Sequence, residues 1–221
     1  MKSWKKRALA LTMAALVVLS GCTFPFGQGN DGDGAPVDNV DVSDAYFGLA
    51  WYRSGTTLNP VMDGTEVNSM LREALYEGLF EIKNDFTLEN ELCEDYTSDG
   101  TTFSFTIKKG IKFWSGAELT ASDVAESLKT VLENESSPYH NRLTEVSSIE
   151  EVTKRMVRIT LASPNINFPK LLDIPIYRAG TTDEGEFAEG TGPYKPVQNG
   201  AAWTLEANEN WHGGFLGTIR H

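Results

Sequence analysis

Few side chains of this 221-residue sequence are spaced for catalysis. The three histidines, His140, His212 and His221, form no His-Glu-x-x-His pattern, and the chain contains no Gly-x-Ser-x-Gly elbow, P-loop or dinucleotide fingerprint. The acidic residues Glu89, Glu91, Glu94 and Asp95 could form a carboxylate pair, but polar turn residues surround them and indicate a solvated surface. The sequence therefore predicts a binding protein rather than an enzyme, with no cofactor and no bound metal.

Cys22 stands where a cysteine can be acylated. Four basic residues in the first seven positions precede an apolar run at 8–19, which is too short to span a bilayer and is typical of a signal peptide. Residues 19–22, Leu-Ser-Gly-Cys, resemble the bacterial lipobox, in which the cysteine thiol receives a diacylglyceryl group. We expect a lipoprotein signal peptide at 1–21 and lipidation at Cys22, which would anchor the mature chain to the membrane. The alternative is an ordinary signal peptide followed by a chance cysteine.

Charge and cysteine content argue against further classes of function. The chain has 19 Lys and Arg against 31 Asp and Glu, and loss of residues 1–21 would leave 15 against 31, a net charge of −16. Such an acidic chain is not expected to bind nucleic acid. The other cysteine, Cys93, can form no internal disulfide if Cys22 is lipidated. We interpret Cys93 as a small buried residue, and a redox or metal role is the alternative.

The composition changes near residue 44. Residues 22–43 are rich in Gly, Asp and Asn and have almost no periodic apolar residues, which is typical of a flexible tether. From Asp44 onward, helical and strand periods alternate without an internal repeat. We expect helices at 65–79 and 120–134, capped by Thr65 and Thr120, strands at 101–107, 155–161, 194–197 and 203–207, a short apolar element at 168–174, and turns at 84–85, 99–100 and 116.

Seven short blocks occur in an order that is specific when they are taken together. They are LYEGL at 75–79, DGTTFSF at 99–105, KKGIKF at 108–113, SG at 115–116 with LTASDV at 119–124, SPY at 137–139, TGPY at 191–194 and NENW at 208–211. In this order they resemble family 5 of the bacterial extracellular solute-binding proteins, the oligopeptide, dipeptide and nickel receptors of ABC importers. The resemblance covers nearly all of residues 46–214.

The resemblance implies an α/β fold of the class II periplasmic-binding-protein type, a two-lobed clam with an extra domain on its first lobe. By that resemblance, residues 44–61 and 162–214 belong to the first lobe and residues 62–161 form the extra α+β domain. In the family a long second lobe follows the segment that resembles residues 211–214. We therefore expect the second lobe to be missing and residues 215–221 to be the tail of a truncated chain, with a natural one-lobe receptor as the alternative.

The resemblance also suggests which side chains face the solute. Thr56 and Thr57 follow the first strand, where the family approaches its ligand, although they could equally just initiate a turn. Tyr139 matches the aromatic residue that peptide receptors place in the cleft, where a Tyr ring offers both an apolar face and a hydroxyl. Tyr177 and Thr191 flank the crossing toward the second lobe and complete the expected ligand-binding set.

The expected partners are a peptide or other small solute, an ABC permease and ATPase, and the membrane through the lipid anchor. This places the chain at the extracytoplasmic face of the cell membrane. The family resemblance leaves nickel and haem-type ligands open. A surface sensor or adaptor for signalling and a non-functional remnant are the alternative functions.

Overall fold

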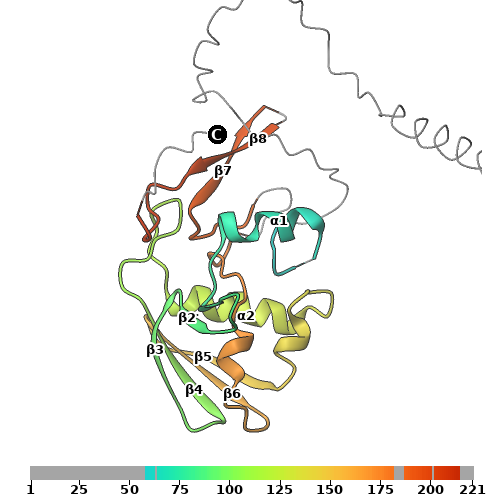
Figure 1. Ribbon diagram of the computed structural model, residues 1–221, viewed down its shortest axis with the longest axis vertical. Helices are drawn as coiled ribbons and strands as arrows, with labels where there is room; N and C mark the ends of the chain where they lie inside the picture. Colours follow the sequence, from blue (N-terminus) through green and yellow to red (C-terminus); the bar gives the residue numbers. More distant parts are fainter. Residues whose placement is uncertain (1–57, 63, 182–186, 201, 215–221) are drawn as a thin grey trace, which may run out of the picture. The chain divides into compact units, whose positions relative to one another are not determined.

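The computed structural model describes residues 58–62, 64–181, 187–200 and 202–214, all within one unit that spans residues 41–221. Helices and strands alternate along this part of the chain (Figure 1). In chain order they are α1 (Glu66–Leu75), β1 (Phe80–Ile82), β2 (Leu88–Asn90), β3 (Cys93–Ser98), β4 (Thr102–Ile107), α2 (Ala121–Glu133), η2 (His140–Arg142), β5 (Val146–Thr153), β6 (Met156–Leu161), η3 (Phe168–Leu171), β7 (Tyr194–Asn199) and β8 (Ala202–Ala207).

A four-stranded antiparallel sheet has the strand order β3-β4-β6-β5, and α2 packs on one of its faces (Figure 1). The predicted alternation in β4 is confirmed, because Phe103, Phe105 and Ile107 are buried and the residues between them are half-buried. The edge strands β3 and β5 were not predicted. Their outer residues are mostly exposed, so they carry no clear apolar alternation.

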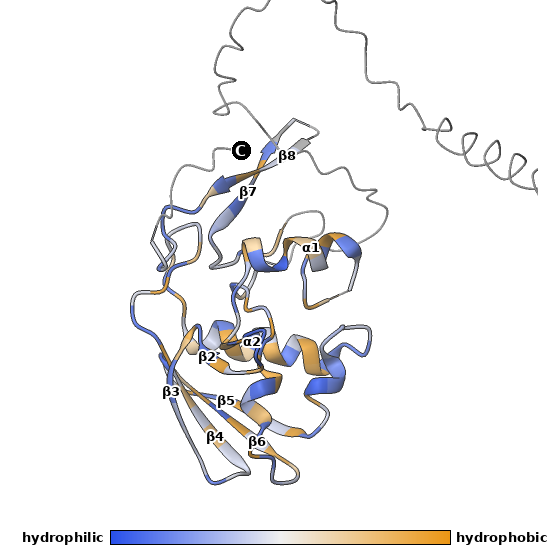
Figure 2. Cartoon of the chain, in the orientation of Figure 1, coloured by the Kyte–Doolittle hydropathy of each residue, from blue (hydrophilic) through white to orange (hydrophobic). Residues whose placement is uncertain are grey.

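Helix α2 begins where the sequence predicts. The Asp123 carboxylate accepts hydrogen bonds from the Thr120 N–H at 2.8 Å and from the Thr120 hydroxyl at 2.6 Å, and the helix ends at Glu133 with Asn134 as its C-cap. Its inward positions, among them Val124 and Leu128, are buried. Hydrophobic and hydrophilic residues both occur along the ribbon of α2, as expected for an amphipathic helix (Figure 2).

Helix α1 is shorter than predicted. The Thr65 hydroxyl accepts the Asn68 N–H at 3.4 Å and caps the helix as expected, but the helix ends at Leu75 rather than at residue 79. Tyr76 is extended, and Glu77 pairs with Ile176 in an antiparallel bridge. The apolar spacing continues past Leu75, but pairing with other segments replaces helical hydrogen bonds there.

The remaining expected turns and strands agree with the structure. The 84–85 turn joins β1 to β2, and Gly100 and Gly116 have φ values of 93° and 89°, which a residue with a Cβ resists. The last two predicted strands pair as the hairpin β7–β8. Cys93 is buried, as expected. In the described ranges, no helix has the length and apolar character needed to cross a membrane.

Candidate functional site

Thr56 and Thr57, two of the predicted ligand residues, lie outside the described residues. The next residue, Leu58, pairs in parallel with Phe187 in an isolated bridge. The buried Tyr76 hydroxyl donates to the Ala188 carbonyl at 2.8 Å and lies 3.4 Å from the Leu58 carbonyl. Tyr76 therefore ties the segment that follows Thr57 to the segment that leads into the TGPY block.

Thr191 lies where that second segment crosses the C-terminal end of α1. It is fully buried, and its hydroxyl oxygen has no hydrogen-bond partner among the described residues. The Gly192 N–H donates to the Leu75 carbonyl at 3.0 Å, which satisfies one of the carbonyls that a helix leaves free at its end. A Cβ on Gly192 would lie 2.5 Å from the Leu75 carbonyl carbon, so only glycine permits this approach.

Tyr177 packs against α2. Its side chain is 1% exposed, and its hydroxyl lies 2.7 Å from the Thr130 hydroxyl. The Ser127 hydroxyl donates to the Tyr177 carbonyl at 3.1 Å or to the Asp123 carbonyl at 2.8 Å, and it accepts the Tyr177 N–H at 3.0 Å. Burial raises the pKa of the Tyr177 phenol. The structure thus places Tyr177 inside the packing between α2 and the 173–179 segment.

Tyr139 lies just before η2 and is 9% exposed. The guanidinium carbon of Arg142 lies 5.0 Å from the centre of its ring, and that of Arg72 lies 6.0 Å from it. Beside it, Pro138 packs on Gly64, where an added Cβ would lie 3.3 Å from the proline ring. The Tyr139 loop therefore borders the segment that follows Leu58.

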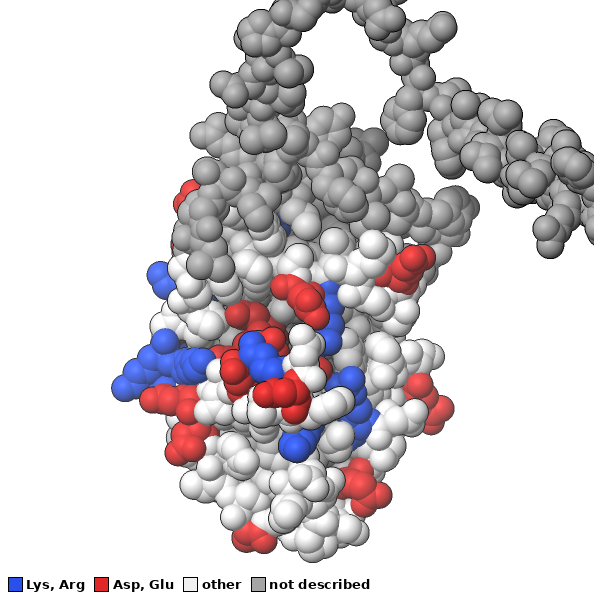
Figure 3. All heavy atoms as spheres, viewed as in Figure 1, with Lys and Arg blue, Asp and Glu red and all other residues white. Residues whose placement is uncertain are grey.

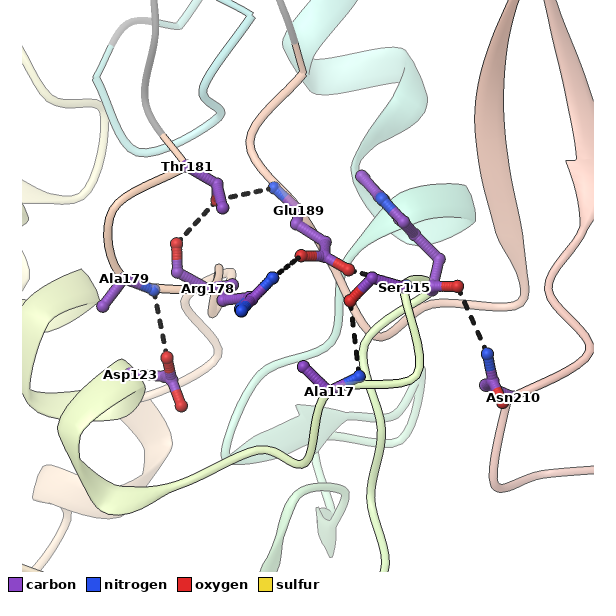
Figure 4. Close-up of polar contacts among 9 residues, drawn as sticks. Ser115, Ala117, Asp123, Arg178, Ala179, Thr181, Glu189 and Asn210 are labelled. Atoms are coloured by element: carbon purple, nitrogen blue, oxygen red, sulfur yellow. Dashed lines mark hydrogen bonds and ion pairs between the residues drawn. The ribbon is translucent and has the colours of Figure 1, made fainter.

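Glu189 lies in the segment that leads into the TGPY block and has a buried carboxylate. It contacts the loop that contains Ser115 and the loop that contains Arg178 and Thr181 (Figure 4). Its side chain is 8% exposed, accepts the Ser115 N–H at 2.6 Å and forms an ion pair with Arg178 at 2.9 Å. The Glu189 N–H donates to the Thr181 hydroxyl, which in turn donates to the Arg178 carbonyl at 2.6 Å. The charge of the buried acid is therefore paired, and each of its carboxylate oxygens accepts a hydrogen bond.

The backbone of Trp114 extends this junction. Its N–H donates to the Gly190 carbonyl at 3.2 Å. Its carbonyl accepts a hydrogen bond at 3.2 Å from the side-chain amide of Asn210, which is labelled in Figure 4. The Trp114 ring is half-buried and lies 6.2 Å from the Tyr76 ring. The loop that contains Trp114 is thereby fixed to both ends of the segment around the TGPY block.

Glu77 is a second buried carboxylate, and its partners come from a distant part of the sequence. One of its carboxylate oxygens accepts the indole N–H of Trp211 at 3.0 Å and lies 2.9 Å from Nε2 of His212. The adjacent Gly78 N–H donates to the half-buried Glu91 carboxylate at 2.7 Å. Burial, followed by the charges of Glu77 and Glu81, raises the pKa of Glu91 to about 7, although the Gly78 hydrogen bond opposes this shift.

The sequence did not single out Glu189, Arg178 or Glu77 as individual residues. Glu189 stands two positions before the TGPY block, Arg178 follows Tyr177, and Glu77 lies inside the LYEGL block. Proximity to these blocks was thus the available signal, but the contacts join residues up to 135 positions apart. The arrangement offers hydrogen-bonding and aromatic surfaces, and the described ranges contain no group of three His, Cys, Asp or Glu side chains that could hold a metal.

Sequence comparisons match residues 87–217 to the family model described as bacterial extracellular solute-binding proteins, family 5 middle. The glutathione-binding protein GsiB of Salmonella choleraesuis is 31% identical over 156 residues, which cover 63% of this chain and 30% of that relative. GsiB of Escherichia coli is 30% identical over 155 residues, with the same two shares. The chain thus spans about a third of the length of the curated relatives it matches.

Solved structures give the same likeness in fold. NikA from Brucella suis, in complex with Fe(III)-EDTA, has a TM-score of 0.63 at 22% identity, over 75% of this chain and 36% of NikA. The oligopeptide-binding protein AppA from Bacillus subtilis, in complex with a nonapeptide, has a TM-score of 0.62 at 22% identity, over 72% of this chain and 35% of AppA. The predicted α/β periplasmic-binding-protein fold is confirmed, and the described chain corresponds to about a third of it.

Proposed function

We propose that this chain, which belongs to family 5 of the bacterial extracellular solute-binding proteins, binds a peptide-like solute for delivery to an ABC importer. The observation that carries the proposal is the match of residues 87–217 to the family model. Glutathione, which the relatives at 30–31% identity are named for binding, is a tripeptide, and the AppA structure contains a nonapeptide. A peptide is therefore the solute class that these two comparisons share.

The residues of the proposed solute site are Thr56, Thr57, Tyr139, Tyr177 and Thr191. Tyr139 would supply an aromatic face and a hydroxyl to a peptide backbone. Thr191 is fully buried and its hydroxyl has no partner among the described residues, so a solute would supply the hydrogen bond that a buried polar group requires for full stability. Tyr177 is buried, so we assign it to the wall behind the solute, where its hydrogen bonds to α2 keep that wall rigid.

We also propose that residues 1–21 are a lipoprotein signal peptide and that Cys22 carries the lipid. The basic start, the apolar run at 8–19 and the Leu-Ser-Gly-Cys tetrapeptide support this assignment. Two acyl chains would hold the protein at the extracytoplasmic face, where it could meet a permease. The Gly- and Asp-rich residues 22–43 would act as the tether.

Calorimetry tests the proposed function. A receptor of this fold encloses its solute between two walls, and much of its affinity comes from contacts on both. We therefore compare residues 22–221 alone with the same chain joined to the remaining two thirds of a GsiB relative, each against glutathione and a mixed peptide pool. We expect micromolar binding by the joined protein and weak or no binding by the short chain. Absence of binding by a folded joined protein would contradict the peptide assignment.

A further inference from the structure

Basic side chains gather at the end of the four-stranded sheet where β4 ends and where the β5–β6 turn lies. This basic patch consists of Lys108, Lys109, Lys112, Lys154 and Arg155. The Ile107 N–H donates to the Arg155 carbonyl at 2.8 Å, so the loop after β4 runs beside the β5–β6 turn. These two residues are 48 positions apart in the sequence. The fold therefore assembles the basic patch from two separate segments.

Nearby acids neutralise only part of this positive charge. Glu118 forms an ion pair with Lys154 at 3.0 Å, and Glu94 forms one with Arg155. Asp95, the next residue along β3, adds a third negative charge at this end of the sheet. The other three lysines of the patch have no ion pair with any described residue. Five positive charges thus meet three negative ones, whereas the chain as a whole is acidic.

The lysines without an ion pair stand on an ordered loop. Lys112 pairs with Glu118 in an antiparallel bridge, and Gly110 turns the chain with a φ of 76°. Lys109 and Lys112 are exposed, and Lys108 is half-buried. Because the backbone beneath these ammonium groups is already fixed, contact with an anion would cost little backbone entropy.

The distribution of charge makes this patch the place where an anionic surface could approach. On the face shown in Figure 3, several basic side chains project together at the left edge, whereas acidic and basic side chains are intermixed near the centre. Attraction between exposed charges falls off within a Debye length of about 10 Å, so the local patch rather than the net charge decides such a contact. An ammonium is a compact point charge that suits phosphate oxygens in many orientations.

The proposed anchor favours a lipid surface as the partner. If Cys22 carries the lipid, Leu58, the first described residue, follows the anchor by about 36 positions, which span at most about 120 Å. The folded part would therefore stay close to the lipid headgroups, at a high effective concentration. Headgroup phosphate is thus the anion that the patch would meet most often.

We infer that the basic patch is a contact surface for the headgroups of an anionic membrane and turns this end of the four-stranded sheet toward that membrane. The inference rests on the lipid anchor proposed at Cys22 and does not depend on which solute is bound. Each lysine near an anionic surface strengthens the contact about fivefold.

The test couples residues 22–221 through the Cys22 thiol to vesicles that contain a maleimide lipid, which stands in for the natural anchor. Cys93 will not compete, because it is buried and burial raises the pKa of its thiol to about 12. The vesicles are made of phosphatidylcholine alone or of an equal mixture of phosphatidylcholine and anionic phosphatidylglycerol. Acetylation of each lysine by a water-soluble reagent, measured by mass spectrometry, then reports which lysines the membrane covers.

We expect Lys109 and Lys112 to be acetylated about fivefold more slowly on the anionic vesicles than on the neutral ones at low salt. High salt should remove the difference, because it shortens the Debye length. Lys170, an exposed lysine in η3, is the matched control and should react equally on both vesicles. Its neighbour Phe168 packs on Phe103 at the opposite end of β4, away from the patch.

Equal acetylation rates of Lys109 and Lys112 on the two vesicles, or equal protection of Lys170, would overturn the membrane contact. Lys109→Gln should lessen the protection of Lys112, and undiminished protection would contradict a joint role of the patch. Inorganic phosphate that protects the uncoupled chain as well as the vesicles do would rule out a membrane surface as the partner. Stronger protection by soluble polyglutamate would assign the patch to an acidic protein instead. Because coupling replaces natural lipidation, these results stand apart from the palmitate test of Cys22 and from solute binding.

Discussion

The crossing of Gly192 over the end of α1 predicts an unusually damaging alanine substitution. In Gly192→Ala the new Cβ would lie 2.5 Å from the Leu75 carbonyl carbon and 2.8 Å from both the Ala74 carbonyl oxygen and the Tyr76 nitrogen. All three atoms belong to the backbone, so no side chain can rotate away. The crossing segment must move from the helix by about 1 Å to restore ordinary contact distances.

The expected loss in free energy of unfolding follows from the contacts that such a shift disturbs. The hydrogen bond from the Gly192 N–H to the Leu75 carbonyl, now 3.0 Å, would be lost, at about 1 kcal/mol. Forcing extra volume into a packed region adds about 1–3 kcal/mol. The sum is a loss of about 3 kcal/mol, well above the ~1 kcal/mol of a typical point mutation. For a chain of this size, the Tm should fall by about 6–12 °C.

Thermal and urea unfolding of residues 22–221, followed by circular dichroism and tryptophan fluorescence, would measure the loss. Gly64→Ala is the matched control, because its Cβ would meet only the Pro138 side chain at 3.3 Å and Gly64 is exposed. We expect that control to lose less than about 1 kcal/mol. A Gly192→Ala midpoint within about 2 °C of the wild type would refute the close approach.

Three further outcomes are expected. Cys22→Ala should abolish incorporation of labelled palmitate in cells, and undiminished labelling would remove the lipobox assignment. Thr191→Val should leave the free energy of unfolding unchanged or slightly higher, because the buried hydroxyl has no partner in the described structure, whereas a loss above about 1 kcal/mol would reveal a hydrogen bond. Burial raises the pKa of Glu91 from its ordinary 4.5 to about 7. Its protonated form therefore contributes fully to the free energy of unfolding below pH 4.5, and this contribution is lost as pH rises toward and through 7. Glu91→Gln should therefore flatten the pH dependence of urea unfolding between pH 4.5 and 7, and an unchanged slope would contradict the shift.

The sequence predicted the elements whose signals are local. Thr120 and Asp123 stand at the spacing of a capped helix start, and β4 alternates between apolar and small polar residues, so α2 and β4 lie where expected. The sequence predicted an α1 that is too long because the spacing of apolar residues continues to Leu79. Only the bridge between Glu77 and Ile176, about a hundred positions away, shows why the helix stops.

The candidate site was less predictable, because its contacts are long-range. The blocks around Tyr139 and Thr191 could be found from the sequence, but the partners of these residues could not. Glu77 and Trp211, for example, are 134 positions apart in the sequence, and only the fold brings their side chains together. Residue-level contacts of this kind require the three-dimensional arrangement, whereas family membership requires only the order of short blocks.

The segment that contains Thr191 is rigidly held, and this rigidity bears on what a contact there can contribute to the affinity for a solute. The segment from Glu189 to Gly192 is fixed on one side by α1 and on the other by the Ser115 N–H, through buried contacts. A solute that binds there meets groups that are already ordered, so little conformational entropy is lost on binding.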